Sequence, residues 1–293
     1  MHKIRAILAL LIMLLSSAFS SILFLLLRIT NMILMRQKKV NIYINKVTKN
    51  LYFLWIKINE LLIAKLLGMQ IEIPQINEIS ENNWYILTSN HQSFFDIILV
   101  QIFCKRHNLY NKFFMKESLI YLPFVGISCW GLDFVFIKRF SKKDLKRNPE
   151  KIVKQHNYIL QKCELFKSYP CTIVNFIEGT RYTKKKAAKS SYKNILGPQP
   201  MGLSLLMTTM QPKIKQVVDI SIVYPDSVDN FFDLFFQKNH KIQLSCNIID
   251  VDNSHAGDYR NDKNYRASFN KWLREIWQIK DQKISDMKQQ LQD

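Results

Sequence analysis

The sequence predicts an α/β fold, in which a mixed, mostly parallel sheet is flanked by helices and preceded by an N-terminal membrane-embedded helical segment. An uncharged apolar run near the N-terminus predicts the membrane segment. After residue 70, short β-branched and aromatic runs alternate with helical stretches, and this alternation predicts the sheet and its helices. We therefore expect an anchor with interfacial helices over residues 1–69 and one α/β domain over residues 70–293.

The anchor is predicted at residues 6–27, a run of 22 uncharged residues, because about 20 apolar residues are enough to cross a bilayer core. A secretory signal peptide has a shorter apolar region and a small-residue cleavage site, so a retained anchor is favoured. Lys and Arg residues are more numerous after the run, from Arg28 onward, than before it. The positive-inside rule then predicts that the domain after the anchor faces the cytoplasm. A hairpin confined to one leaflet fits the sequence equally well.

Residues 41–69 follow as a second predicted helix. Its apolar side chains on one face are Leu51, Trp55, Ile58, Leu62 and Leu66. Such a face packs either on the protein body or on a lipid surface, and the spacing favours neither.

The remaining chain provides the sheet and its covering helices. Strands are predicted at residues 84–89, 134–137, 171–176, 217–223 and 242–249. Helices are predicted near residues 97–105, 142–166, 202–210 and 265–291.

Charge and composition narrow the class of partner. The 293 residues include 42 Lys and Arg against 23 Asp and Glu, which gives a formal net charge of +19. Residues 1–50 contribute +8 and residues 138–215 contribute +14, so the excess lies beside the anchor and in one part of the body. This distribution favours an anionic bilayer surface and phosphorylated ligands over nucleic acid. The five cysteines form no C-x-x-C pair, which disfavours a zinc ribbon.

The first polar cluster follows the predicted strand 84–89 and contains His91 and Asp96. Ligands tend to bind at the carboxyl edge of such a sheet. Five positions amount to about 140° around a helix, so the two side chains meet only if His91 lies in the entry turn and Asp96 in the first helical turn. A carboxylate on one imidazole nitrogen leaves the other nitrogen to accept a proton. The spacing alone also fits a histidine that caps the helix.

The second cluster follows the predicted strand 171–176 and consists of Glu178, Gly179, Thr180 and Arg181. A glycine at this point permits close backbone approach or a positive φ. Arg181 offers a planar fork of donors suited to phosphate. Taken alone, the cluster also fits an ordinary turn with a surface salt bridge.

The third cluster follows the predicted strand 134–137 and begins with Lys138 and Arg139. Arg139 is the better candidate for a bidentate contact with phosphate. Charge runs of this kind are usually solvated surface, so this cluster alone does not identify a site.

The three clusters occur in order as NHQSFFD (residues 90–96), FIKR (136–139) and FIEGTR (176–181). The ordered set resembles the glycerophospholipid acyltransferase family, typified by 1-acyl-glycerol-3-phosphate acyltransferases, over roughly residues 70–225. Lys138 departs from the type pattern, which often has Asp or Asn there, and the first of two prolines around residues 217–224 is absent. Residues 197–203 look more like the long-chain lysophospholipid acyltransferase subgroup.

The resemblance implies a membrane-bound O-acyltransferase that moves a fatty acyl group from a thioester to the free hydroxyl of a lysophospholipid. The expected acceptor is 1-acyl-glycerol-3-phosphate, and the donor co-substrate is acyl-CoA or an acyl carrier protein thioester. Membrane lipids are expected partners, whereas nucleic acid, a metal or another cofactor is not. The expected location is the inner or cytoplasmic membrane, with the catalytic domain facing the cytoplasm.

The resemblance also implies roles for the clusters. His91 is expected to act as the general base and Asp96 to orient it. The expected acceptor-binding residues are Arg139, Glu178, Gly179, Thr180 and Arg181. Four other functions stay open at this point: acylation of another lysophospholipid headgroup, a thioesterase with water as acceptor, a non-catalytic lipid-binding protein and a nucleic-acid-binding protein.

Overall fold

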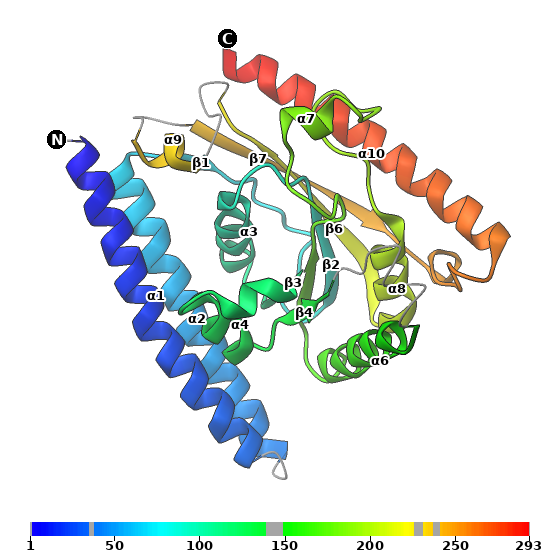
Figure 1. The fold of residues 1–293 in the computed structure, drawn as a ribbon, viewed down its shortest axis with the longest axis horizontal. Helices are drawn as coiled ribbons and strands as arrows, with labels where there is room; N and C mark the ends of the chain where they lie inside the picture. Colours follow the sequence, from blue (N-terminus) through cyan, green and yellow to red (C-terminus); the bar gives the residue numbers. More distant parts are fainter. Residues whose placement is uncertain (1, 35–37, 139–148, 226–230, 237–240, 293) are drawn as a thin grey trace.

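The computed structural model describes residues 2–34, 38–138, 149–225, 231–236 and 241–292, and its centre is a seven-stranded sheet (Figure 1). The strands are β1 (Gln70–Glu72), β2 (Trp84–Ser89), β3 (Asn111–Lys116), β4 (Val135–Ile137), β5 (Thr172–Asn175), β6 (Ile214–Val223) and β7 (Lys241–Asp250). They lie in the order β1-β7-β6-β2-β5-β3-β4. The β6–β7 pair is antiparallel and the other five neighbouring pairs are parallel, so the predicted mixed, mostly parallel sheet is confirmed.

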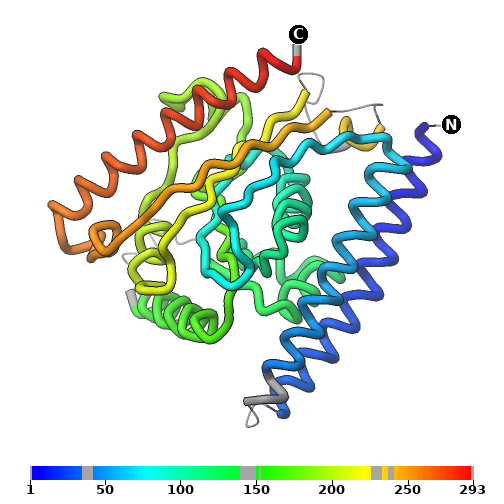
Figure 2. The backbone as a smooth tube through the Cα atoms, turned by 180° about the vertical axis from the view of Figure 1, so that it is seen from behind, coloured from blue at the N-terminus to red at the C-terminus, as the bar shows by residue number. Residues whose placement is uncertain are grey.

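Helices cover both faces of this sheet (Figures 1 and 2). One face carries α1 (His2–Ile33), α2 (Lys38–Leu67), α3 (Phe95–Arg106) and α4 (Val125–Gly131). The other carries α6 (Pro149–Phe166), α8 (Pro200–Met210) and α10 (Lys263–Gln292). The connections contain α7 (Lys184–Ala187), α9 (Phe231–Phe236) and the 3-10 turns η1 (Glu117–Tyr121) and η2 (Asn253–His255). Strand alternation separates two cores: Tyr85 and Leu87 pack toward the first layer, and Ile86 packs toward the second.

The five predicted strands and four predicted body helices are present, apart from residues 142–148 of one helix, which lie outside the described residues. Strands β1 and β3 were not predicted. In β3 a buried lysine hides the strand pattern, because Lys112 is only 2% exposed. Its ammonium group lies 3.9 Å from the Tyr110 ring centroid and donates a hydrogen bond to Leu132 O at 2.7 Å.

The helices α1 and α2 form a long antiparallel pair along one side of the body (Figure 2). Helix α1 is long and apolar enough to cross a membrane. Only 17% of its apolar 18-residue stretch is buried inside the protein. The buried residues of α2 include Tyr52, Ile56 and Ile63, about one position along from the face predicted from the sequence. The buried face of α2 also contains the polar residues Thr48 and Asn59, which a search for apolar residues does not find.

Helix α1 is fixed to the body through α4. A Cβ at Gly131 would lie 2.8 Å from the Phe24 backbone, so only glycine allows the two helices this approach. Just after α4, Asp133 accepts a hydrogen bond from Arg28 of α1 at 2.7 Å and also pairs with Lys162 of α6. The first layer, the loop after α4 and the second layer are thus joined at one carboxylate.

Candidate active site

The site is built where parallel strands end together. The strands β6, β2, β5, β3 and β4 run in one direction, so the residues that follow them meet at the carboxyl edge of the sheet. His91 follows β2, residues 176–181 follow β5, Lys116 ends β3 and Tyr224 follows β6. Arg139, the predicted residue after β4, lies outside the described residues.

His91 and Asp96 form a pair at this edge. His91 lies in the loop before α3 and Asp96 in its first turn, which is the arrangement that their spacing requires. The distance between His91 Nδ1 and Asp96 Oδ2 is 2.9 Å. The same oxygen accepts hydrogen bonds from the backbone N–H groups of Gln92 at 2.6 Å and Ser93 at 2.8 Å. The bond to Nδ1 leaves Nε2 of His91 as the nitrogen that can take a proton.

Two contacts, one from β6 and one from the residue after it, complete the support of this pair, and no sequence pattern predicts either. The Tyr224 hydroxyl donates to Asp96 Oδ1 at 2.5 Å, so both carboxylate oxygens are bonded in a fully buried position. Asn90 bonds both backbone groups of Ile222, donating to its carbonyl at 2.9 Å and accepting from its N–H at 2.8 Å. Each partner lies about 130 residues away along the chain, where no local pattern links them.

The residues after β5 hold the His91 backbone from the other side. Glu178 Oε1 accepts a hydrogen bond from the His91 N–H at 3.2 Å, and Tyr182 donates its N–H to the His91 carbonyl at 2.7 Å. The imidazole ring stacks on Phe176 with 4.3 Å between ring centroids. His91 is therefore held by its main chain, its ring face and its Nδ1.

Glu178 itself lies beneath the cavity rather than on its wall, with 3% of its surface exposed. Its Oε2 has no hydrogen-bond partner among the described residues. Burial raises the pKa of the Glu178 carboxyl to about 8, and the bond from the His91 backbone opposes that rise. Its position fits support of His91 better than direct contact with a substrate.

Gly179, Thr180 and Arg181 form the turn that leads out of β5. Gly179 has a φ of +68°, a conformation that favours glycine. Lys186 donates hydrogen bonds to the Thr180 hydroxyl at 2.6 Å and to the Arg181 carbonyl at 3.0 Å. The Arg181 guanidinium lies 3.6 Å from the ring centroid of Phe94, which carries it over the first motif. The structure thus brings the first and second predicted clusters together.

A cavity of about 540 Å³ opens beside this turn. Its wall includes His91, Phe94, Ile97, Phe113, Phe114, Met115, Lys116, Ser118, Leu119, Ile137, Asn175, Phe176, Ile177, Gly179, Thr180, Arg181, Gln199 and Gly202. Most of these side chains are apolar, and the two cations among them are Lys116 and Arg181. Lys116 was not singled out from the sequence, because it ends β3, a strand that the sequence did not predict.

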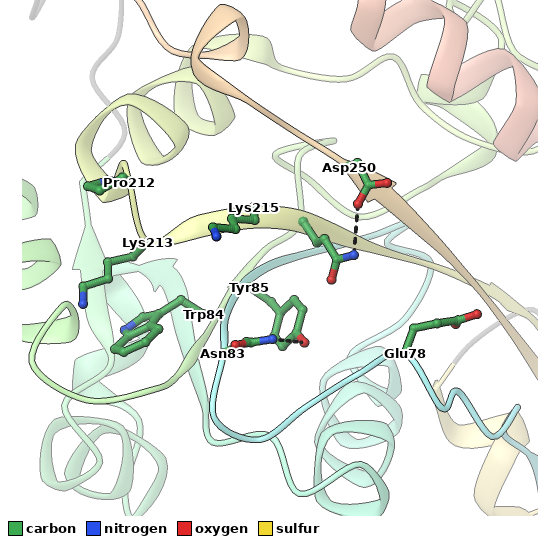
Figure 3. A pocket seen from close by; sticks show the side chains of 9 residues that line it. Glu78, Asn83, Trp84, Tyr85, Pro212, Lys213, Lys215 and Asp250 are labelled. Atoms are coloured by element: carbon green, nitrogen blue, oxygen red, sulfur yellow. Dashed lines mark hydrogen bonds between the residues drawn. The ribbon is translucent and has the colours of Figure 1, made fainter.

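Another depression lies at the opposite, amino edge of the sheet (Figure 3). It is formed around Trp84 at the start of β2, Lys213 and Lys215 before and within β6, and Asp250 at the end of β7. None of the motif residues that the structure describes lines this depression. We therefore assign the chemistry to the carboxyl edge.

The arrangement at the carboxyl edge places a His–Asp pair and two cations beside an apolar wall. The described residues include no group of three or more His, Cys, Asp or Glu side chains arranged to hold a metal ion. A substrate with an anionic head and a long apolar part suits such a lining.

Comparisons with known proteins identify acyltransferases as similar proteins. The family model described as Acyltransferase matches residues 70–213. A 1-acyl-sn-glycerol-3-phosphate acyltransferase of Arabidopsis thaliana is 27% identical over 152 residues, which are 48% of this chain and 37% of the relative. A lysophosphatidylinositol acyltransferase of Caenorhabditis elegans is 24% identical over 79% of this chain and 60% of the relative. The chain thus spans little more than a third of the plant relative.

A solved structure shares the fold along nearly the whole chain. It is the 1-acyl-sn-glycerophosphate acyltransferase PlsC of Thermotoga maritima, with a TM-score of 0.58 and 19% sequence identity. The match covers 97% of this chain and 98% of that one. With the ordered motifs and the matching family model, the chain belongs to the glycerophospholipid acyltransferase family.

Proposed function

We propose that the protein is a membrane-bound O-acyltransferase that transfers a fatty acyl group from an acyl thioester to the free hydroxyl of 1-acyl-glycerol-3-phosphate. The observation that carries the proposal is the His91–Asp96 pair at 2.9 Å on the wall of a cavity that also contains Arg181 and Lys116. The donor is acyl-CoA or an acyl carrier protein thioester. The plant relatives with this acceptor in their names support the choice of acceptor.

In the proposed reaction the acceptor hydroxyl attacks the thioester carbonyl carbon while its proton passes to His91 Nε2. The tetrahedral intermediate then collapses, the C–S bond breaks and the departing sulfur takes the proton back from His91. Asp96 fixes the ring orientation and stabilises the imidazolium that forms between the two steps. General-base catalysis of this kind contributes about 10²–10⁴-fold to the rate.

The cations of the cavity would bind the acceptor phosphate. Arg181 has the planar fork that matches phosphate oxygens, and Lys116 adds a second positive charge on the same wall. Arg139 is a further expected contact. Gly179 and Thr180 would shape the turn that carries Arg181, and Glu178 would act by holding His91.

The N-terminal helix supports attachment to a membrane, the phase in which lysophospholipids reside. Helix α1 exposes large apolar side chains along its length, among them Leu15, Phe19 and Ile22. We propose that this surface lies in the bilayer and that the catalytic domain faces the cytoplasm, following the excess of Lys and Arg after residue 27.

Lysophosphatidylinositol is a second candidate for the acceptor. Two curated relatives that match most of this chain are lysophosphatidylinositol acyltransferases, at 66% and 79% of its length. Residues 197–203 resemble the same broader subgroup. Lysophosphatidylinositol is therefore the alternative acceptor.

The test is an acyl-transfer assay with detergent-purified full-length protein and labelled acyl-CoA or acyl carrier protein thioester. Lysophosphatidate, lysophosphatidylinositol and other lysophospholipids are supplied in parallel. His91→Ala should lower transfer by about 10²–10⁴-fold without loss of folding. The matched control is His255→Ala, because His255 also pairs with a carboxylate, Asp252, at 2.9 Å but lies away from the cavity.

An active His91→Ala enzyme would exclude the proposed base. Release of free fatty acid without any need for a lysophospholipid would identify a thioesterase instead. Binding of lysophospholipid without turnover in the wild type would identify a lipid-binding protein.

A further inference from the structure

A second hollow lies next to the catalytic cavity, on the other side of the edge strand β4, and we call it the basic groove. It has a volume of about 540 Å³ and is lined by Glu117, Ile120, Tyr121, Trp130, Phe136, Lys138, Lys151, Lys154, Gln155 and Tyr158. Phe136 and Lys138 line this groove, whereas Ile137 between them lines the catalytic cavity. Strand alternation therefore separates the two hollows.

Three lysines give the groove its charge. Lys151 and Lys154 are three residues apart on α6, and Tyr158 continues the same face. The third, Lys138, comes from the end of β4 and is held by a hydrogen bond from its N–H to the Gln155 side chain at 2.8 Å. In the part of the chain that the structure describes, none of the three forms an ion pair, and Glu117 is the acidic residue of the lining. The groove therefore carries net positive charge that a ligand can neutralise.

The groove lies beside the end of α1 that carries Arg28. Its wall includes Trp130, and the guanidinium of Arg28 lies 5.8 Å from that ring centroid. Arg28 is the first charged residue after the apolar run 6–27, and such flanking charges lie at the membrane surface. Trp and Tyr side chains are also enriched at that depth.

An exposed apolar strip borders the groove on the side of η1 and α4. Its most exposed side chains are Tyr121 at 82%, Leu122 at 47% and Val125 at 44%. Helix α4 packs directly on α1, so the strip continues the apolar surface of the anchor. A lipid in the groove would have its headgroup on the lysines and its chains along this strip.

We propose that the basic groove binds the headgroup phosphate of an anionic glycerophospholipid of the surrounding bilayer, at a site separate from the catalytic cavity. Two or three lysines beside a phosphate diester supply charge complementarity, and the aromatic wall and apolar strip favour a lipid over a soluble anion. The site rests on membrane attachment through α1. It does not depend on the identity of the acceptor or on the His91 chemistry.

The test measures binding of dioctanoyl phosphatidylglycerol to the full-length protein in neutral detergent by titration calorimetry. The double variant Lys151→Gln/Lys154→Gln should raise the dissociation constant about tenfold or more, because each lysine near a lipid surface contributes roughly fivefold to the affinity. The matched control is Lys271→Gln/Lys283→Gln, which removes the same charge from exposed positions on α10. Figure 1 shows α10 on the far side of the sheet from α1. The control should change binding by less than about twofold.

Further measurements distinguish a lipid headgroup from a soluble phosphate compound as the ligand of the groove. Dioctanoyl phosphatidylcholine should bind much more weakly, and neither inorganic phosphate nor free coenzyme A should displace phosphatidylglycerol. The variant Arg181→Gln should bind phosphatidylglycerol as the wild type does, because Arg181 belongs to the catalytic cavity. Equal losses in the two lysine double variants would overturn the proposal in favour of bulk charge. Displacement by coenzyme A, with a raised KM for acyl-CoA in Lys151→Gln/Lys154→Gln, would overturn it in favour of a donor site.

Discussion

The buried carboxyl of Glu178 should make the stability of the protein fall as the pH rises. Glu178 is 3% exposed and one of its oxygens has no partner among the described residues, so burial disfavours its charged form. Its pKa is raised from the usual 4.5 to about 8. The folded protein therefore holds a proton between these two pH values that the unfolded chain releases.

The sign and size follow from this difference. Because the folded state binds more protons than the unfolded state in this window, the free energy of unfolding decreases as the pH rises. The loss begins above pH 4.5 and is complete above about pH 8. One pKa unit corresponds to about 1.4 kcal/mol, so the full loss is at most about 5 kcal/mol.

Glu178→Gln removes the titration and keeps an acceptor oxygen for the His91 N–H. Its unfolding temperature in detergent, measured from pH 5 to pH 9, should decline less than that of the wild type. With roughly 2–4 °C per kcal/mol for a large domain, the two curves should diverge by at most about 10–20 °C at the alkaline end. Glu164→Gln is the control, because the Glu164 side chain is 65% exposed. Parallel curves for wild type and Glu178→Gln would refute the reasoning.

Two predictions concern catalysis. Tyr224→Phe removes the Oδ1 donor of Asp96 and should lower kcat about tenfold or more. Tyr85→Phe, at another buried hydrogen-bonded tyrosine, should leave kcat unchanged. Arg181→Gln should raise the KM for the lysophospholipid about tenfold or more with little effect on the donor KM. A raised donor KM with an unchanged acceptor KM would contradict that role, and Arg274→Gln on α10 controls for charge.

The sequence predicted most of the sheet because its strands are short apolar runs with clear ends. It did not predict β3, where Asn111 and Lys112 are polar yet buried. Lys112 is accommodated by contacts with the Tyr110 ring and the Leu132 carbonyl, which only the folded chain brings together. Likewise, the buried Thr48 and Asn59 concealed which side of α2 packs inward.

The candidate site was predictable where its parts are local. His91 and Asp96 are five residues apart, so their meeting could be derived from helix geometry and the loop before α3. Tyr224 reaches the same carboxylate from a strand 128 residues later, and no spacing rule covers such a contact. The sequence also does not predict that the Glu178 side chain points into the protein, because the side chain of a turn residue next to a binding motif can point either way.

The packing of Gly131 against Phe24 has a consequence for making a water-soluble form of the protein. Removing α1 would uncover the underside of α4 and unpair Asp133 from Arg28. The turn η1 packs on α4 and supplies Ser118 and Leu119 to the wall of the catalytic cavity. Without α1, the packing that supports this turn would be weakened. Solubilisation by truncation would therefore damage the enzyme, whereas replacing the outward-facing apolar residues of α1 with polar helix formers would keep its inner face and spare the active site.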